Sequence, residues 1–401
     1  MSNLFPYGGS TQIMAIGLKL LVLSAIAAVA TAATPPRPAM GVRRASVVET
    51  SAVSKPSLVA AAPVVAPAPK VDVSLLLYFV FWYVGNAVYN MYNTMALKAV
   101  GGKYSGLTMT VSTLQLGICT LYAGLLWLTN FNPVTLLGLS KPEKMPLPQT
   151  TKADIVDTLP VGFCAAAAHS AGVFCLGADP LFGQIVKAGE PVLSAAVNTV
   201  FYGKPPSLAK VVCLFFIVGG VAFASLKKDL ASGLYKLKFD ERALIFGMIG
   251  NSFAAFKGAE NKKLMVKPGL KDRMGGVANQ FALTEVLGFF ISLPVMFATE
   301  YKKHPEFCTM LASSTELQMG LLASGMAFYL YNELATMTIK KTGAVTASVA
   351  NTAKRVIVLV FMSAVTGKAL TNEQKIGAVV AIAFVMLYSV IDEVVKKFKS
   401  A

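Results

Sequence analysis

The chain has 401 residues, of which 55% are hydrophobic and 14% are charged, and its formal net charge is +16. Soluble domains carry about 25% charged residues, so a chain this apolar is suited to lipid and is not an ordinary water-soluble protein. A basic excess is typical of membrane-protein loops that touch lipid headgroups. No basic run is interleaved with aromatic residues in a soluble segment, so we expect membrane lipid, and no nucleic acid, among the partners.

Residues suited to metal binding or catalysis are few. The chain has five Cys, four of them inside apolar runs and none in a C-x-x-C pair, and only two His, His169 and His304. The Cys pattern is typical of small core residues rather than of disulfides or metal ligands. We see no paired carboxylates and no His cluster near an interface, so we expect no metal, no cofactor and no enzymatic activity.

The chain begins with two segments typical of targeting sequences. Residues 1–33 contain a short apolar run that ends in small residues at Ala30-Thr31-Ala32, which predicts a signal peptide, with a first membrane helix as the alternative. Residues 34–70 are rich in Ala, Pro, Val and Ser, with five basic residues and one acid, and resemble a disordered transit peptide. The tandem suggests a plastid membrane, in a complex plastid reached through the secretory route.

The remainder, residues 71–396, is predicted to be a membrane domain, followed by a short tail at 397–401. A helix needs about 20 apolar residues to cross the hydrocarbon core, and only closed helices satisfy the backbone there. Ten such runs occur, at 74–97, 104–129, 155–178, 181–202, 208–226, 243–265, 276–299, 317–339, 343–366 and 372–394.

Two pairs of segments, each about 165 residues apart, are similar in sequence. Gly85-Asn86 in the first run matches Gly250-Asn251 in the sixth, and GKPPS at 203–207 matches GKALT at 367–371. We infer that five helices were duplicated, and an odd number requires the second half to be inverted. The predicted fold is therefore an all-α membrane protein of ten transmembrane helices in two inverted repeats, at 71–230 and 241–396, with a site near the midplane.

Charged side chains inside the apolar runs indicate that site. A Lys or Arg at the centre of a membrane helix costs roughly 2.5–3.5 kcal/mol, so such residues face a cavity or a partner. Structural alternatives are an ion pair between Lys187 and Glu190 and helix packing of the other acids. Lys354 and Arg355 are adjacent and point about 100° apart, so one acid could hardly neutralise both. The charged residues concerned are Lys187, Lys257, Lys354, Arg355, Glu190, Glu285 and Glu333.

The missing counter-charge is expected to be a ligand anion. Arg grips phosphate through two parallel hydrogen bonds and Lys adds a point charge, so this set suits a divalent phosphate ester. His169 and Tyr331 are candidates for the other end of the ligand, where each could hydrogen-bond a carboxylate or hydroxyl. Their structural alternatives are a satisfied core histidine and a packing aromatic residue.

At these residues the chain resembles the plastid triose-phosphate/phosphate translocators, in the sugar-phosphate branch of the drug/metabolite transporter superfamily. The resemblance covers about residues 74–394, and its most specific stretches are FGQIVKAGEP and VANTAKRVIVLV. It implies ten helices, alternating access, and strict exchange of inorganic phosphate for triose phosphate or 3-phosphoglycerate. It also implies that Lys187, Lys354 and Arg355 bind phosphate, that Tyr331 and His169 contribute to the site, and that Gln184 stands where the pattern has His.

Other departures from the family pattern are Gly172, where a hydroxyl residue is expected, and Thr94, where Lys is usual. The phosphate end is thus intact, while the end that distinguishes carbon skeletons is altered. Phosphoenolpyruvate, pentose phosphate or hexose phosphate are therefore alternative substrates. A nucleotide-sugar transporter and a channel are the alternative functions.

Overall fold

The computed structural model describes residues 73–138, 144–228, 235–237, 239–342 and 344–400. The two targeting segments predicted at 1–33 and 34–70 lie outside these ranges. The described part of the chain is a helical membrane protein. Besides helices it contains one hairpin of two three-residue strands, β1 (Leu226–Lys228) and β2 (Tyr235–Leu237). Four segments are long and apolar enough to cross a membrane: Thr108–Thr129, Lys152–Ala178, Val277–Ser313 and Asn372–Lys396.

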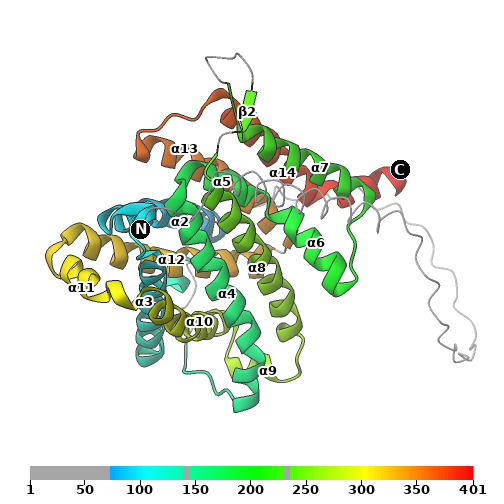
Figure 1. The fold of residues 1–401 in the computed structure, drawn as a ribbon. Coiled ribbons are helices and arrows are strands. Elements are labelled where there is room, and N and C mark those ends of the chain that lie inside the picture. Colours follow the sequence, from blue (N-terminus) through cyan, green and yellow to red (C-terminus); the bar gives the residue numbers. More distant parts are fainter. Residues whose placement is uncertain (1–72, 139–143, 229–234, 238, 343, 401) are drawn as a thin grey trace, which may run out of the picture.

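The predicted first half contains α-helices and, on either side of α3, a short 3₁₀ helix; Figure 1 shows the α-helices. They are α2 (Val73–Ala99), η1 (Gly102–Tyr104), α3 (Thr108–Thr129), η2 (Pro133–Gly138), α4 (Lys152–Ala178), α5 (Pro180–Ala188), α6 (Glu190–Tyr202) and α7 (Leu208–Ala224).

The predicted second half contains two short helices, α9 and α11, that the sequence pattern did not indicate. Its elements are α8 (Glu241–Met265), α9 (Leu270–Met274), α10 (Val277–Glu300), η3 (Tyr301–Lys303), α11 (His304–Ser313), α12 (Thr315–Thr342), α13 (Ala344–Thr366) and α14 (Asn372–Ser400). Helices overlap each of the ten predicted ranges, and α14 continues into the predicted tail at 397–401.

The range 181–202 was predicted as one helix, but it is divided into α5 and α6 at Gly189. Pro191 has no backbone N–H and cannot donate to the carbonyl of Lys187, so the helical ladder is interrupted there. The N–H of Gly189 instead donates to the Val186 carbonyl at 2.9 Å, which closes α5 with a tight turn. The break places Lys187 near the end of α5 and Glu190 at the start of α6, on either side of the turn at Gly189.

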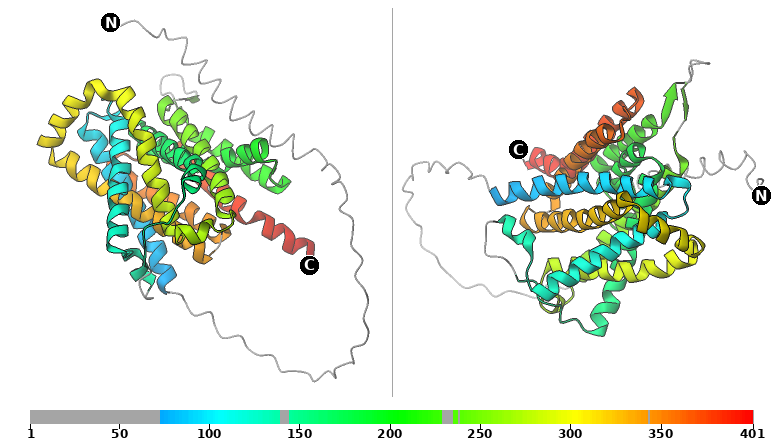
Figure 2. Two further views of the ribbon diagram at one scale, coloured as in Figure 1. Left: turned by 90° about the horizontal axis from the view of Figure 1, so that it is seen from below. Right: turned by 90° about the vertical axis from the view of Figure 1, so that its left-hand side faces the viewer.

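The helices pack in pairs that join the two predicted halves. α2 lies against α12, α4 against α8, α3 against α10, and α7 against α14, and Figure 2 shows α2 alongside α12. A polar link at one end of the bundle also crosses between the halves, where the Lys103 ammonium lies 2.7 Å from the Asp240 carboxylate. Burial alone would raise the pKa of the Asp240 carboxyl, but the hydrogen bond and charge of Lys103, together with hydrogen bonds from the backbone N–H groups of Ala243 and Arg242, lower that pKa overall.

The contact between α7 and α14 depends on glycine. A Cβ atom on Gly220 would lie 2.7 Å from both the Gly377 carbonyl oxygen and the Ala381 nitrogen, so no side chain fits there. The neighbouring Gly219 would meet nothing within 4 Å. Small residues let membrane helices approach closely and gain van der Waals contact, which is the source of attraction when lipid replaces water.

Candidate anion-binding cavity

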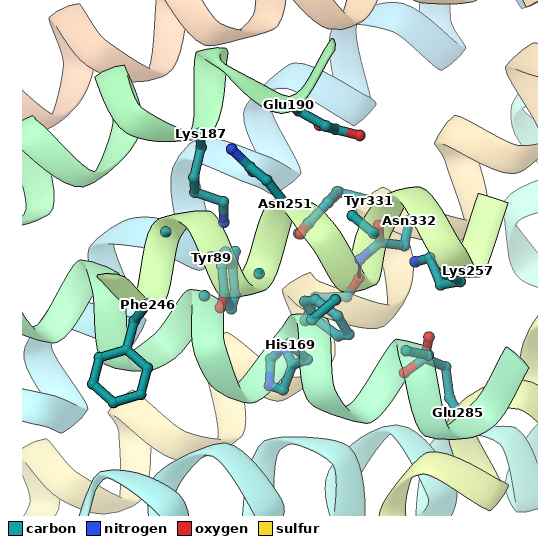
Figure 3. A pocket seen from close by; sticks show the side chains of 17 residues that line it. Tyr89, His169, Lys187, Glu190, Phe246, Asn251, Lys257, Glu285, Tyr331 and Asn332 are labelled. Carbon is teal, nitrogen blue, oxygen red and sulfur yellow. Dashed lines mark hydrogen bonds between the residues drawn. The ribbon is translucent and has the colours of Figure 1, made fainter. Parts of the chain in front are cut away.

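A cavity of about 130 Å³ lies between α4, the α5–α6 break, α8, α10 and α12 (Figure 3). At about 30 Å³ per water this is room for roughly four waters, or for a small anion. The side chains that give it chemical character are Tyr89, His169, Lys187, Glu190, Asn251, Lys257, Glu285, Phe328, Tyr331 and Asn332. Four of the seven predicted site residues therefore line one cavity: His169, Lys187, Lys257 and Tyr331.

Lys187 reaches the cavity from the end of α5. Phe182 and Ile185 on the same helix are buried in a cluster with residues of α13 and α14, which fixes the orientation of α5. The amide of Asn251 donates to the Val186 carbonyl at 3.0 Å and holds the backbone at the break. Lys187 Nζ is so close to Gly172 that a Cβ there would lie 3.3 Å from it. In the described part of the chain Lys187 forms no ion pair, so the expected alternative of pairing with Glu190 is not realised.

Arg355 lies behind the cavity rather than in its lining, and it is paired. Its Nη2 atom donates to Oε2 of Glu190 at 2.5 Å, joining α13 to the start of α6. The expectation that all three phosphate-binding cations lack a protein carboxylate is therefore wrong for Arg355 in this conformation. The physical reason is that the α5–α6 break turns Glu190 away from Lys187 and toward the other half.

Lys354 is held by aromatic rings. Its Nζ atom lies 5.3 Å from the centroid of the Trp82 ring and 5.6 Å from that of Tyr331. Such contacts are worth about 2 kcal/mol when desolvated. Within the ranges that the structure describes, Lys354 makes no ion pair. Because Tyr331 also lines the cavity, Lys354 stands directly behind that wall.

His169 belongs to a cluster of aromatic rings that line the cavity. Its ring centroid lies 4.1 Å from that of Phe328 and 6.3 Å from that of Tyr89, and Tyr89 lies 5.6 Å from Tyr331. Nε2 of His169 is buried and has no hydrogen-bond partner among the described residues. A buried polar atom without a partner is costly, so the alternative of a fully satisfied core histidine is not realised at this nitrogen.

Lys257 and Glu285 lie at the end of the cavity away from Lys187 (Figure 3). Gln184, by contrast, is not among the residues that line the cavity. Its side-chain amide donates a hydrogen bond to Oδ1 of Asn90 at 2.7 Å. Glu333 is also outside the cavity and accepts a 2.5 Å hydrogen bond from Asn132. Glu333 therefore joins two segments by packing, which is the structural alternative that the sequence analysis gives for this residue.

Several lining residues had weak or no sequence signals. Asn251 was visible as part of the repeated Gly-Asn pair, and Asn332 as a polar neighbour of Tyr331, but neither pattern indicated a cavity. Nothing in the sequence singled out Tyr89 or Phe328, because aromatic residues in apolar helices are usually packing residues.

The charges around the cavity do not balance. Lys187, Lys257, Glu190 and Glu285 line it, and Lys354 and Arg355 contact lining residues directly. These four cations and two carboxylates leave a formal excess of two positive charges. In a low-dielectric interior such an excess is costly, and a doubly charged anion would remove it.

The sequence was compared with protein families and with characterised proteins. The sequence model of the Triose-phosphate Transporter family matches residues 73–389. A chloroplast triose phosphate/phosphate translocator of Brassica oleracea var. botrytis is 27% identical over 325 residues, which is 79% of this chain and 71% of that protein. A chloroplast phosphoenolpyruvate/phosphate translocator 1 of Oryza sativa subsp. japonica is 27% identical over 328 residues, 80% of this chain and 73% of that protein. The chain therefore belongs to the Triose-phosphate Transporter family, and it is a transporter and not an enzyme.

Proposed function

We propose that this protein exchanges inorganic phosphate for small phosphorylated anions, with three-carbon esters as the first candidates, across a plastid membrane. The observation that carries the proposal is the excess of two positive charges around one cavity between the helices. A phosphate ester carries about −1.5 to −2 charge at neutral pH, so it matches this excess. The plastid membrane is inferred from the chloroplast relatives and from the leader composition, which also favours a complex plastid reached through the secretory route.

The names of the relatives support phosphate as the shared substrate and leave the carbon skeleton open. Relatives named for triose phosphate and for phosphoenolpyruvate are equally similar, both at 27% identity. Because the carbon skeleton is open, phosphoenolpyruvate, hexose phosphates and pentose phosphates are all substrates to be tested.

We further propose ten membrane spans in two inverted halves. Equivalent contacts occur on both sides of the bundle and support this. Gly85 on α2 meets the Cβ of Tyr331 on α12, while Gly250 on α8 meets Ala168 on α4. The separations from Gly85 to Gly250 and from Ala168 to Tyr331 are 165 and 163 residues, so the two contacts fall at similar positions in the two halves.

A second pair of contacts involves the fourth predicted helix of each half, and in this pair the acceptors match, whereas the donors, Asn251 and Tyr83, stand 168 residues apart. Asn251 on α8 donates to the Val186 carbonyl on α5, and Tyr83 on α2 donates to the Ala350 carbonyl on α13 at 2.9 Å. Val186 and Ala350 are 164 residues apart. Alternating access would then exchange the two arrangements by rocking one half against the other.

In the proposed mechanism, Lys187, Lys354 and Arg355 receive the phosphate group, and Tyr331, His169 and Lys257 contact the rest of the ligand. Without a ligand, closing the site buries uncompensated charge, which opposes occlusion. A bound dianion removes that penalty, so only the loaded carrier changes sides and transport becomes obligatory exchange. Gln184 keeps an indirect role in this scheme, because its bond to Asn90 positions α5.

Counter-exchange in liposomes tests the proposed function. Purified protein should take up labelled phosphate rapidly when the vesicles contain phosphate or a three-carbon phosphate, and very slowly when they contain neither. Equal uptake with and without internal substrate would indicate a channel, and uptake driven only by internal nucleotide sugar or nucleotide would indicate the other carrier class. A panel of triose phosphate, 3-phosphoglycerate, phosphoenolpyruvate, pentose phosphate and hexose phosphate then ranks the carbon skeletons.

Tyr331→Phe should change substrate preference more than phosphate uptake. The variant keeps the ring beneath Lys354 but loses the hydroxyl, so contacts to the carbon skeleton are affected first. We expect the exchange ratio between triose phosphate and inorganic phosphate to change about tenfold, which corresponds to one hydrogen bond. An equal loss for all substrates would assign Tyr331 a purely structural role.

A further inference from the structure

Glu190 occupies an unusual position for a structural ion-pair partner. It is the first residue of α6, where the helix dipole favours a negative charge, and it lines the same cavity as Lys187 (Figure 3). Its side chain is 35% exposed, whereas that of Arg355 is 11% exposed. The carboxylate is thus the accessible member of the pair, and it can leave while the guanidinium stays in place.

The pair uses only part of the capacity of Arg355. The one hydrogen bond that joins the two side chains runs from Nη2 to Oε2. A guanidinium has five N–H donors arranged to bind two oxygens of one anion, and carboxylate and phosphate oxygens compete for the same donors. A phosphate that entered the cavity beside Lys187 would therefore meet an arginine already holding an anion.

We propose that Glu190 is an internal counter-anion, which holds Arg355 in the empty carrier and gives way to the phosphate group of the substrate. The inference rests on the proposed function and adds a residue to it. Glu190 lowers the net affinity, because part of the energy of binding phosphate is spent on displacing it. It speeds release, because the carboxylate returns to Arg355 when the substrate leaves.

The same contact links substrate occupancy to the two halves of the carrier. Glu190 lies in the first predicted half and Arg355 in the second, 165 residues away. Lys187 is only three residues from Glu190 but forms no ion pair with it, so the carboxylate is committed to the contact between halves in this conformation. When phosphate replaces this carboxylate on Arg355, the ion pair between α6 and α13 is lost, and the bound substrate takes its place.

Glu190→Gln in liposomes tests the proposal. With no competing charge on Arg355, we expect the KM for inorganic phosphate and for triose phosphate to fall about tenfold, as removal of one charge-assisted hydrogen bond from the unbound state implies. The maximal exchange rate should fall too, because tighter binding slows release. A residue with a merely structural role would lower the rate without lowering KM.

Two variants complete the experiment. Glu190→Asp keeps the charge on a shorter side chain and should lower KM about threefold, so it tests the idea even if the Gln variant does not fold. Glu333→Gln removes a buried carboxylate that lies outside the cavity and should leave KM unchanged within about twofold. An unchanged or raised KM in folded Glu190 variants would overturn the inference. Failure of the parent protein to exchange any phosphorylated anion would instead overturn the proposed function.

Discussion

Arg355→Ala should lower the rate of phosphate exchange by more than about 100-fold while the protein still folds. The change removes a donor for phosphate and leaves Glu190 without its partner at the rim of the cavity, where its charge repels an incoming anion. Truncating one member of a close charge pair typically costs 2–5 kcal/mol, and about 2.7 kcal/mol corresponds to 100-fold. The measurement is counter-exchange in liposomes at matched protein content, with the unfolding temperature in detergent as the check on folding.

A double variant separates the two causes of that loss. Arg355→Ala combined with Glu190→Gln lacks both the donor and the repelling carboxylate, so it should recover part of the lost exchange. Recovery would show that the two side chains act on the same step. If Arg355→Ala alone exchanged phosphate at the parent rate, Arg355 would have no part in binding, and the proposed site would be wrong.

Gly220→Leu should destabilise the protein by more than about 3 kcal/mol. Overpacking of a well-packed core typically costs 1–3 kcal/mol, and here the obstacles are backbone atoms of Gly377 and Ala381 that cannot rotate away. The α7–α14 contact would have to separate. We expect a large fall in the yield of folded protein from membranes and in the unfolding temperature of what remains.

The adjacent glycine provides the matched control. Gly219 is on the same helix, and a Cβ atom on it would meet no atom of another element within 4 Å, so Gly219→Leu should fold normally and exchange phosphate at the parent rate. Equal damage from both substitutions would mean that leucine is poorly tolerated anywhere on α7. Tolerance of Gly220→Leu would show that the helices do not pack as described.

Some of the fold could be predicted because lipid imposes a simple rule. Long apolar runs must be helical, and helices overlap all ten predicted ranges. The break at Gly189 differs from the sequence prediction, because the mostly apolar range 181–202 has the length of one membrane helix while Pro191 lies inside it. Pro in a helix interior removes a hydrogen bond, so Pro191 is the sequence signal for this break.

The sequence by itself determined which charges lie at membrane depth. Lys187, Lys257, Lys354 and Arg355 occur within apolar runs, and the cost of exposing them to lipid requires an interior position. Only the tertiary structure decided their partners. It paired Arg355 with Glu190, placed Lys354 against Trp82, and left Gln184 outside the cavity. These outcomes depend on how helices from two distant segments rotate and meet, and local patterns of hydrophobicity and spacing do not encode that.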